Sequence, residues 1–171
     1  MSQEEVSQSW CFVTWATYNS RVSESMVEFN PPEFTKDVEP IVFGYQSQLV
    51  VARLVVEAIE KHDLSVHTFN VLPDHVHMLV KVSSDEELAE KIGSIKGYIA
   101  NQIRKKSNTT SKIWASKFHR QWIKDNGDLE KIVRYIKLNH IKHSATWGRD
   151  YLCGFGPELT EIVKNLNVKL I

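Results

Sequence analysis

Between residues 71 and 82, apolar and other residues alternate along the chain. Pro73-Asp74 predicts a tight turn, and the residues after it follow the period of two that is typical of a β-strand. The apolar face of this strand carries Val76, Met78, Val80 and Val82. The other face carries His75, His77, Leu79 and Lys81. Two histidines at this spacing lie roughly 6–7 Å apart, close enough to bind one cation, although an unliganded pair of strand histidines fits the pattern too.

The rest of the chain shows the same two periodicities. Apolar residues at helical spacing alternate with aromatic or β-branched runs. We expect helices over about 43–62, 84–106 and 129–142, and strands over 10–19, 64–72 and 113–124. Asp128 is the expected N-cap of the third helix, and residues 157–171 offer one short helix. This order predicts an α+β fold, with a ferredoxin-like or RRM-like antiparallel sheet and packed helices.

The composition is that of an ordinary globular protein, with 42% hydrophobic and 25% charged residues in 171. We expect one domain over residues 1–171, with 150–171 as a C-terminal extension. Two cysteines are too few for a disulfide framework, and the acidic N-terminus is unlike a signal peptide. The expected localisation is therefore cytoplasmic.

The net charge of zero conceals a strong asymmetry. Residues 1–90 hold 5 Lys/Arg and 15 Asp/Glu, a net −10, whereas residues 91–149 hold 14 and 3, a net +11. Residues 150–171 hold 2 and 3, a net −1. A segment this basic is typical of proteins that contact a phosphate backbone, although a solvated helix face neutralised by the acidic half is the equally simple alternative.

The helix expected at 129–142 carries a second candidate group. Tyr135 and Asn139 stand at i and i+4, so both lie on one edge of its apolar stripe, beside cationic residues. A hydroxyl placed there could meet a phosphate, but tyrosine is a poor nucleophile unless a cation assists it. A tyrosine that only packs its ring explains the same pattern.

Together these segments resemble the single-tyrosine transposases that carry the HUH motif, a histidine, a bulky apolar residue and a histidine. Residues 73–80 (PDHVHMLV) resemble that motif, and residues 135–139 (YIKLN) look like the tyrosine segment of the REP-associated, IS200-like branch. The aromatic segments at 13–18 and 114–123 are similar to strands of the same family. The resemblance covers about residues 10–148.

The resemblance implies a role for each matching residue. His75, His77 and Asn139 would bind a divalent metal ion, Mg²⁺ or Mn²⁺, and Tyr135 would be the nucleophile. The implied reaction is metal-dependent cleavage and strand transfer of single-stranded DNA through a 5′-phosphotyrosine, which is the chemistry of DNA transposition. The alternatives are a catalytically silent or domesticated DNA hairpin-binding protein of the same fold and a metal hydrolase that does not act on nucleic acid.

Three features depart from the family pattern. Asp74 stands where Asn is usual, His140 stands where Pro is usual, and the first half of the chain is acidic. Tyr98 with Gln102 forms a second tyrosine–amide pair on the preceding helix, and we assign the nucleophile to Tyr135 over Tyr98.

The basic and aromatic residues also predict which molecules the protein binds. We expect single-stranded or hairpin DNA as the partner and no membrane association. The expected DNA-binding residues are Lys96, Arg104, Lys105, Arg120, Trp122 and Lys137. The aromatic strand at 10–18 could be an exposed sheet edge, which would favour a homodimer, with the tyrosine acting either in cis or in trans.

Overall fold

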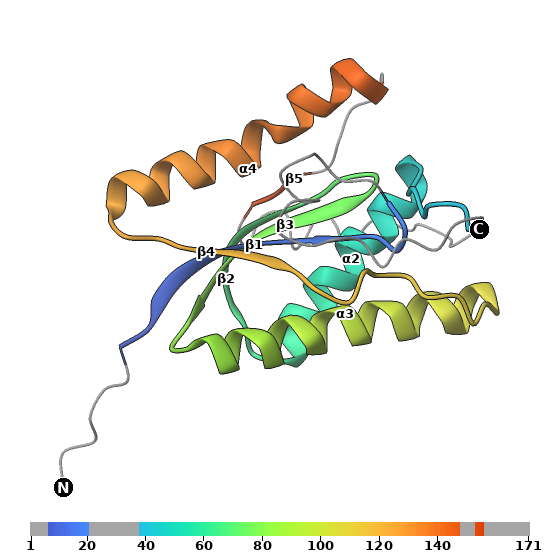
Figure 1. The fold of residues 1–171 in the computed structure, drawn as a ribbon, viewed down its shortest axis with the longest axis horizontal. Helices are drawn as coiled ribbons and strands as arrows, with labels where there is room; N and C mark the ends of the chain where they lie inside the picture. The colour runs from blue at the N-terminus through green and yellow to red at the C-terminus, as the bar shows by residue number, and fades with distance from the viewer. Residues whose placement is uncertain (1–6, 21–37, 148–152, 156–171) are drawn as a thin grey trace, which may run out of the picture.

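A five-stranded antiparallel sheet forms the centre of the protein, with helices on both of its faces (Figure 1). The computed structural model describes residues 7–20, 38–147 and 153–155. In chain order the elements are β1 (Ser9–Ala16), α2 (Tyr45–Lys61), β2 (Ser65–Val71), β3 (His75–Val82), α3 (Asp85–Ser107), β4 (His119–Trp122), α4 (Asn126–Trp147) and β5 (Cys153–Phe155). The strands lie in the order β4-β1-β3-β2-β5. The first four strands, with α2 and α3 as crossovers, have ferredoxin-like topology, so the predicted α+β class is confirmed.

The apolar face of β3 forms the main core together with α2 and α3. Its four predicted side chains are buried, and they pack with alternate residues of β1 and with the inner stripe of α3. These neighbours include Cys11, Val13, Trp15, Ile92, Ile95 and Ile99. Each fully buried aliphatic side chain contributes about 1.5–3 kcal/mol. Among the residues whose side chains the structure describes, this layer contains more buried residues than the layer on the other face and supplies the larger share of their hydrophobic stabilisation.

The opposite face of the sheet is covered by α4, as Figure 1 shows. Ile136 is fully buried against Phe12 and Leu79, and the partly buried Leu129, Ile132 and Val133 extend this contact. These α4 residues are the apolar stripe that the sequence predicts. Because His75 and His77 belong to the same face of β3 as Leu79, α4 covers the face that bears the histidines.

The fourth strand is shorter than predicted. β4 contains only His119–Trp122, rather than residues 113–124. Trp114 forms an isolated bridge with Thr17 and buries its ring against the α2 side of the sheet. The segment before β4 is therefore held by side-chain packing and not by a strand ladder.

The start of α4 also differs from the prediction. The helix begins at Asn126, so Gly127 and Asp128 lie inside its first turn. Asp125 Oδ1 accepts a hydrogen bond from the Asp128 backbone N–H at 2.9 Å, so Asp125, and not Asp128, satisfies that first-turn donor. Asp128 instead adds negative charge at the helix N-terminus, which the helix dipole favours.

The argument for a homodimer from an exposed edge is wrong. β1 is paired with β3 on one side and with β4 on the other, so it is an interior strand. The strands at the two edges are the four-residue β4 and the three-residue β5. Short edge strands are a common protection against edge-to-edge pairing. The dimer itself stays a prediction without this support.

Residues of the predicted C-terminal extension join the sheet. β5 pairs with β2, with Gly154 opposite Phe69. The sequence did not predict this strand, and the short helix expected at 157–171 lies outside the described residues. Among the helices of the described ranges, none is long and apolar enough to cross a membrane.

Lys96 fixes the segment that leads into β4. Its side chain is buried on α3, and its Nζ donates hydrogen bonds to three successive backbone carbonyls, at 2.8 Å, 3.1 Å and 3.3 Å. Those carbonyls belong to Ala115, Ser116 and Lys117. Burial, with a smaller effect of the Lys112 charge, lowers the pKa of Lys96 to about 8. The amine is therefore largely protonated at neutral pH and acts as a structural donor.

Replacing Lys96 with Met should lower the free energy of unfolding by about 1–3 kcal/mol, because the carbonyls lose a buried charged donor. Chemical denaturation measures this loss. Lys105→Met is the control, since Lys105 is exposed on the same helix and its loss should change stability by less than about 0.5 kcal/mol. A Lys96→Met protein of unchanged stability that binds DNA more weakly would support the phosphate contact predicted from the sequence instead.

Candidate active site

His75 and His77 lie side by side on β3 under α4. Each is 4% exposed, and their Nε2 atoms are 3.2 Å apart. The two imidazole nitrogens therefore point to one place, as the alternation of β3 predicts. For comparison, an octahedral cation held at about 2.1 Å keeps two neighbouring ligands about 3 Å apart. The histidine pair fits a single divalent cation.

Hydrogen bonds at the Nδ1 atoms hold both rings in this orientation. His75 Nδ1 lies 2.6 Å from Asp74 Oδ1, and His77 Nδ1 lies 2.7 Å from Thr14 Oγ1. Because an ionised carboxylate only accepts, His75 carries its proton on Nδ1 and presents the lone pair of Nε2. The Thr14 hydroxyl both donates and accepts, so it can serve either tautomer of His77. Such partners orient histidine ligands in metal sites.

Tyr135 is brought to this pair by α4 of the same chain. Its ring centroid lies 5.4 Å from that of His77 and 5.9 Å from that of Phe12, with an edge-on contact to Phe12. The residue is 44% exposed, so it stands at the border between the histidine pair and solvent. A phosphodiester arriving from solvent would meet this hydroxyl beside the histidine pair.

Tyr98, the alternative nucleophile, lies elsewhere. It sits on α3, which covers the other face of the sheet, and its hydroxyl donates to Glu57 Oε2 at 3.0 Å. Burial and this bond to the Glu57 carboxylate raise the pKa of Tyr98. Tyr98 is therefore on the wrong side of the sheet to meet the histidines. Its raised pKa also disfavours the ionised hydroxyl that a nucleophile needs.

Asn139 lies one turn after Tyr135 and is 3% exposed. Neither its Oδ1 nor its Nδ2 has a hydrogen-bond partner. Buried amides are nearly always bonded, so an amide with two unpartnered atoms, one helical turn from the tyrosine that contacts His77, suits a cation and its bound water. In the described ranges, no third His, Cys, Asp or Glu completes a metal cluster. The Asn139 oxygen is accordingly a good candidate for the third ligand.

Most of the predicted DNA-binding residues lie away from this face. Arg120 and Trp122 pair with Val13 and Cys11, so their side chains point to the α2–α3 side of the sheet. Both donate to the Asp85 carboxylate, with Arg120 Nε 2.7 Å from Asp85 Oδ1. The structure therefore does not bring these two side chains to the histidines.

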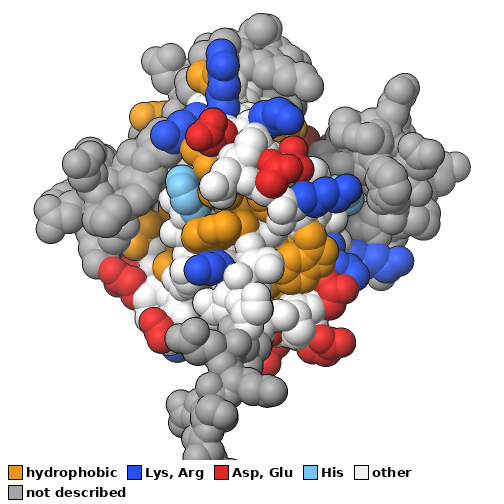
Figure 2. Space-filling model, turned by 90° about the vertical axis from the view of Figure 1, so that its left-hand side faces the viewer, with side chains coloured by type: hydrophobic (Ala, Val, Ile, Leu, Met, Phe, Trp, Pro, Cys, Tyr) orange, Lys and Arg blue, Asp and Glu red, His pale blue; other side chains and the backbone are white. Residues whose placement is uncertain are grey.

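Three further predicted contacts are on α3, on the side of the sheet opposite the histidine pair. Lys96 is buried, Arg104 Nε donates to the Ser111 carbonyl at 3.2 Å, and Lys105 is exposed. Lys137 is the predicted contact that lies on α4. On the face in Figure 2, the Lys and Arg side chains are interspersed with carboxylates and hydrophobic groups and do not form a continuous positive surface.

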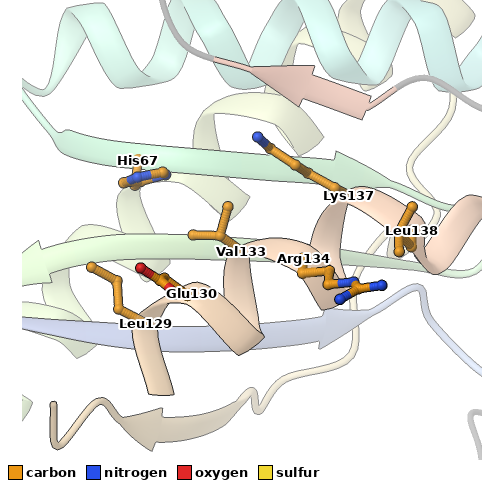
Figure 3. Close-up of a pocket in the computed structure, with 7 residues that line it drawn as sticks. All are labelled: His67, Leu129, Glu130, Val133, Arg134, Lys137 and Leu138. Atoms are coloured by element: carbon orange, nitrogen blue, oxygen red, sulfur yellow. The ribbon is translucent and has the colours of Figure 1, made fainter. Parts of the chain in front are cut away.

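Lys137 lines a groove of about 420 Å³ between α4 and β2. Figure 3 shows His67 on β2 facing the α4 residues of the groove, which are Leu129, Glu130, Val133, Arg134, Lys137 and Leu138. At about 100° per residue, Tyr135 and Lys137 lie on opposite sides of α4. The groove and the histidine site therefore flank the same helix.

Sequence comparison places these residues in a family. The sequence model described as "Transposase IS200 like" matches residues 35–139, more than half of the chain. That span includes both histidines, Tyr135 and Asn139. The chain belongs to the IS200-like transposase family. The resemblance stated from the sequence is thereby confirmed.

Two individual relatives agree with the family assignment. A Haemophilus influenzae protein, predicted to be a REP-associated tyrosine transposase, is 30% identical over 83 residues. This match covers 43% of the present chain and 47% of that protein, so the matched segment spans about half the length of the relative. A solved structure of a REP-associated tyrosine transposase bound to a REP hairpin has the same fold, with a TM-score of 0.53 and 18% identity. The similarity covers 84% of this chain and 74% of that one.

Thr14 and Asn70 are neighbours of the histidine pair that the sequence did not predict. Both are strand neighbours of His77, which stands opposite Thr14 on β1 and opposite Asn70 on β2. The register of β1 on β3 cannot be read from either strand alone, whereas β2 is joined directly to β3 by the turn at Pro73-Asp74. Alternation within residues 64–72 was the available signal for Asn70.

Thr14→Val should weaken binding of Mn²⁺ by about 10–100-fold, because His77 loses the group that orients its ring. Calorimetric titration of the full chain with Mn²⁺ measures this change. Thr14→Ser keeps the hydroxyl and should bind Mn²⁺ nearly as the wild type does. Equal Mn²⁺ affinity in the Val and Ser variants would show that Thr14 does not hold the ring for metal binding.

Proposed function

We propose that this transposase-family chain cleaves and rejoins single-stranded DNA through a covalent link between Tyr135 and a 5′-phosphate. The observation that carries the proposal is the placement of Tyr135, whose ring contacts the ring of His77 from the same chain. A half-exposed tyrosine beside a convergent histidine pair has both the accessibility and the neighbour that a phosphoryl-transfer nucleophile needs.

His75, His77 and the Asn139 amide oxygen would hold a divalent cation, Mg²⁺ or Mn²⁺. When bound, such a cation supplies Lewis-acid polarisation of the scissile phosphate. Asp74 and Thr14 hold the two rings with their Nε2 atoms turned to one place, where the cation would bind. The amide oxygen, together with bound water, suits both Mg²⁺ and Mn²⁺, which favour oxygen ligands.

In the proposed step the Tyr135 oxygen attacks phosphorus, and the bond from phosphorus to the 3′-oxygen breaks. The tyrosine loses its proton, and the departing oxygen leaves as a 3′-hydroxyl. The phosphodiester bond is exchanged and not hydrolysed, so the reverse reaction joins strands without a nucleotide cofactor. Attack by water instead of the tyrosine would hydrolyse the phosphodiester bond. Because α4 covers the histidines closely, it limits the access of water to them.

The proposed substrate is single-stranded DNA next to a hairpin. The solved relative with the same fold is described as bound to a REP hairpin, which supports this class of partner. The groove beside α4 supplies Arg134 and Lys137 for phosphate contacts and an apolar wall for a base or sugar. Among the DNA contacts predicted from the sequence, Lys137 is therefore the one that we retain in this proposal.

Tyr135→Phe should abolish the covalent protein–DNA adduct and leave hairpin binding nearly unchanged, because only the attacking oxygen is removed. Incubation with Mn²⁺ and labelled single-stranded DNA, followed by a denaturing gel, detects the adduct. Tyr98→Phe is the matched control and should retain it. An adduct that survives Tyr135→Phe refutes the assignment, and a wild-type protein that binds hairpins without any adduct is the silent DNA-binding protein considered above.

A further inference from the structure

Asn70 is a fully buried amide on the histidine face of the sheet. It lies on β2 directly opposite His77, so the two side chains rise from the same face of neighbouring strands. Side chains paired in this way have Cβ atoms about 4.5–5.5 Å apart. An amide at this position is a direct neighbour of the proposed metal site.

One end of the Asn70 amide is fixed by α4. Its Nδ2 donates to the Ile136 backbone carbonyl at 3.0 Å. A carbonyl only accepts hydrogen bonds, so the nitrogen must face Ile136 and the oxygen must point away from it. Ile136 is the residue next to Tyr135, and the bond therefore fixes α4 at the position of the nucleophile.

The other end of the amide has no partner. Asn70 Oδ1 is buried and accepts no hydrogen bond. It shares the layer between the sheet and α4 with Asn139, whose two amide atoms are also unpartnered. Leaving a polar atom buried without a partner is costly, and such atoms in native proteins usually meet an ion or a water. Here the unpartnered Asn70 oxygen belongs to the residue opposite His77, which is one of a pair of histidines that fits a cation.

We propose that Asn70 is a further residue of the metal site, with two functions that it performs at once. Its oxygen joins the oxygen ligands around a divalent cation, either by direct contact or through one bound water. Its nitrogen holds α4 so that Tyr135 stays beside His77. This inference rests on the proposed function, because it adds a residue to the same site.

Two substitutions separate the oxygen from the nitrogen. Asn70→Asp and Asn70→Ala both remove the donor to Ile136, but Asp keeps an oxygen and adds negative charge. We expect Asn70→Ala to bind Mn²⁺ at least about 10-fold more weakly than the wild type. Asn70→Asp should bind Mn²⁺ at least as tightly as the wild type, yet form less adduct because α4 is no longer held.

Gln48 supplies a matched control on the other side of the sheet. It is a buried amide on α2 whose Nε2 donates to the Phe43 carbonyl at 2.9 Å and whose Oε1 has no partner. Gln48→Ala and Gln48→Glu therefore repeat the same chemical changes away from the histidines. They should change thermal stability but not the affinity for Mn²⁺.

The measurement is a titration of each full-length variant with Mn²⁺, followed by electron paramagnetic resonance, with thermal unfolding in parallel. Equal Mn²⁺ affinity in the wild type, Asn70→Ala and Asn70→Asp would overturn the inference and leave Asn70 as a packing residue. Equal weakening in Asn70→Ala and Asn70→Asp would also overturn the role of the oxygen. If the expected Mn²⁺ pattern appears while the wild type forms no adduct, the role of the Asn70 oxygen stands and the proposed cleavage fails.

Discussion

The pairing of β3 with both of its neighbours is the constraint on which the site depends. The register places His77 between Thr14 of β1 and Asn70 of β2. A slip of one residue would turn both histidines into the apolar core and expose the valines of β3. The large core under α2 and α3 opposes such a slip, because it buries those valines with the apolar residues of β1. The hydrophobic pattern on one face of β3 thus fixes the orientation of the histidine side chains on the other face.

The helix that carries Tyr135 is held by a smaller contact. Ile136 packs on Phe12 and Leu79, and the Asn70 amide bonds the Ile136 carbonyl. Tyr135 lies on the β1 side of this contact, and the groove lined by Lys137 lies on the β2 side. A single helix thereby separates the proposed chemical step from a surface suited to phosphate. Elements held by few buried contacts move most readily, and the described part of α4 has few of them, which would suit the proposed entry of a DNA strand.

Periodicity alone predicts much of this arrangement. The alternation in residues 75–82 places both histidines on one face, and the helical wheel of α4 places Tyr135 and Asn139 on one edge, as the structure has them. Periodicity does not predict which segments far apart in the sequence will be in contact. Lys96 looks like a surface lysine on a helix, but the chain at 115–117 folds over it.

Arg120 and Trp122 show the same limit. A cationic and an aromatic side chain are typical of DNA contacts. The register of β4 on β1, however, turns both side chains to the face where Asp85 binds them. β4 also ends the pairing after four residues, which the aromatic run at 113–124 does not indicate. Strand length and partner are decided by tertiary packing, so local propensity predicts them poorly.

The central claim is that one chain contributes both the histidine pair and the attacking tyrosine. Mixing a Tyr135→Phe protein with a His75→Ala protein tests this claim directly, with wild-type protein as the positive control. Each subunit then lacks one half of its own site. If the site is complete within one chain, the mixture forms no covalent DNA adduct in the presence of Mn²⁺. An adduct restored by mixing would contradict this arrangement and show that the tyrosine of one subunit acts at the histidines of another.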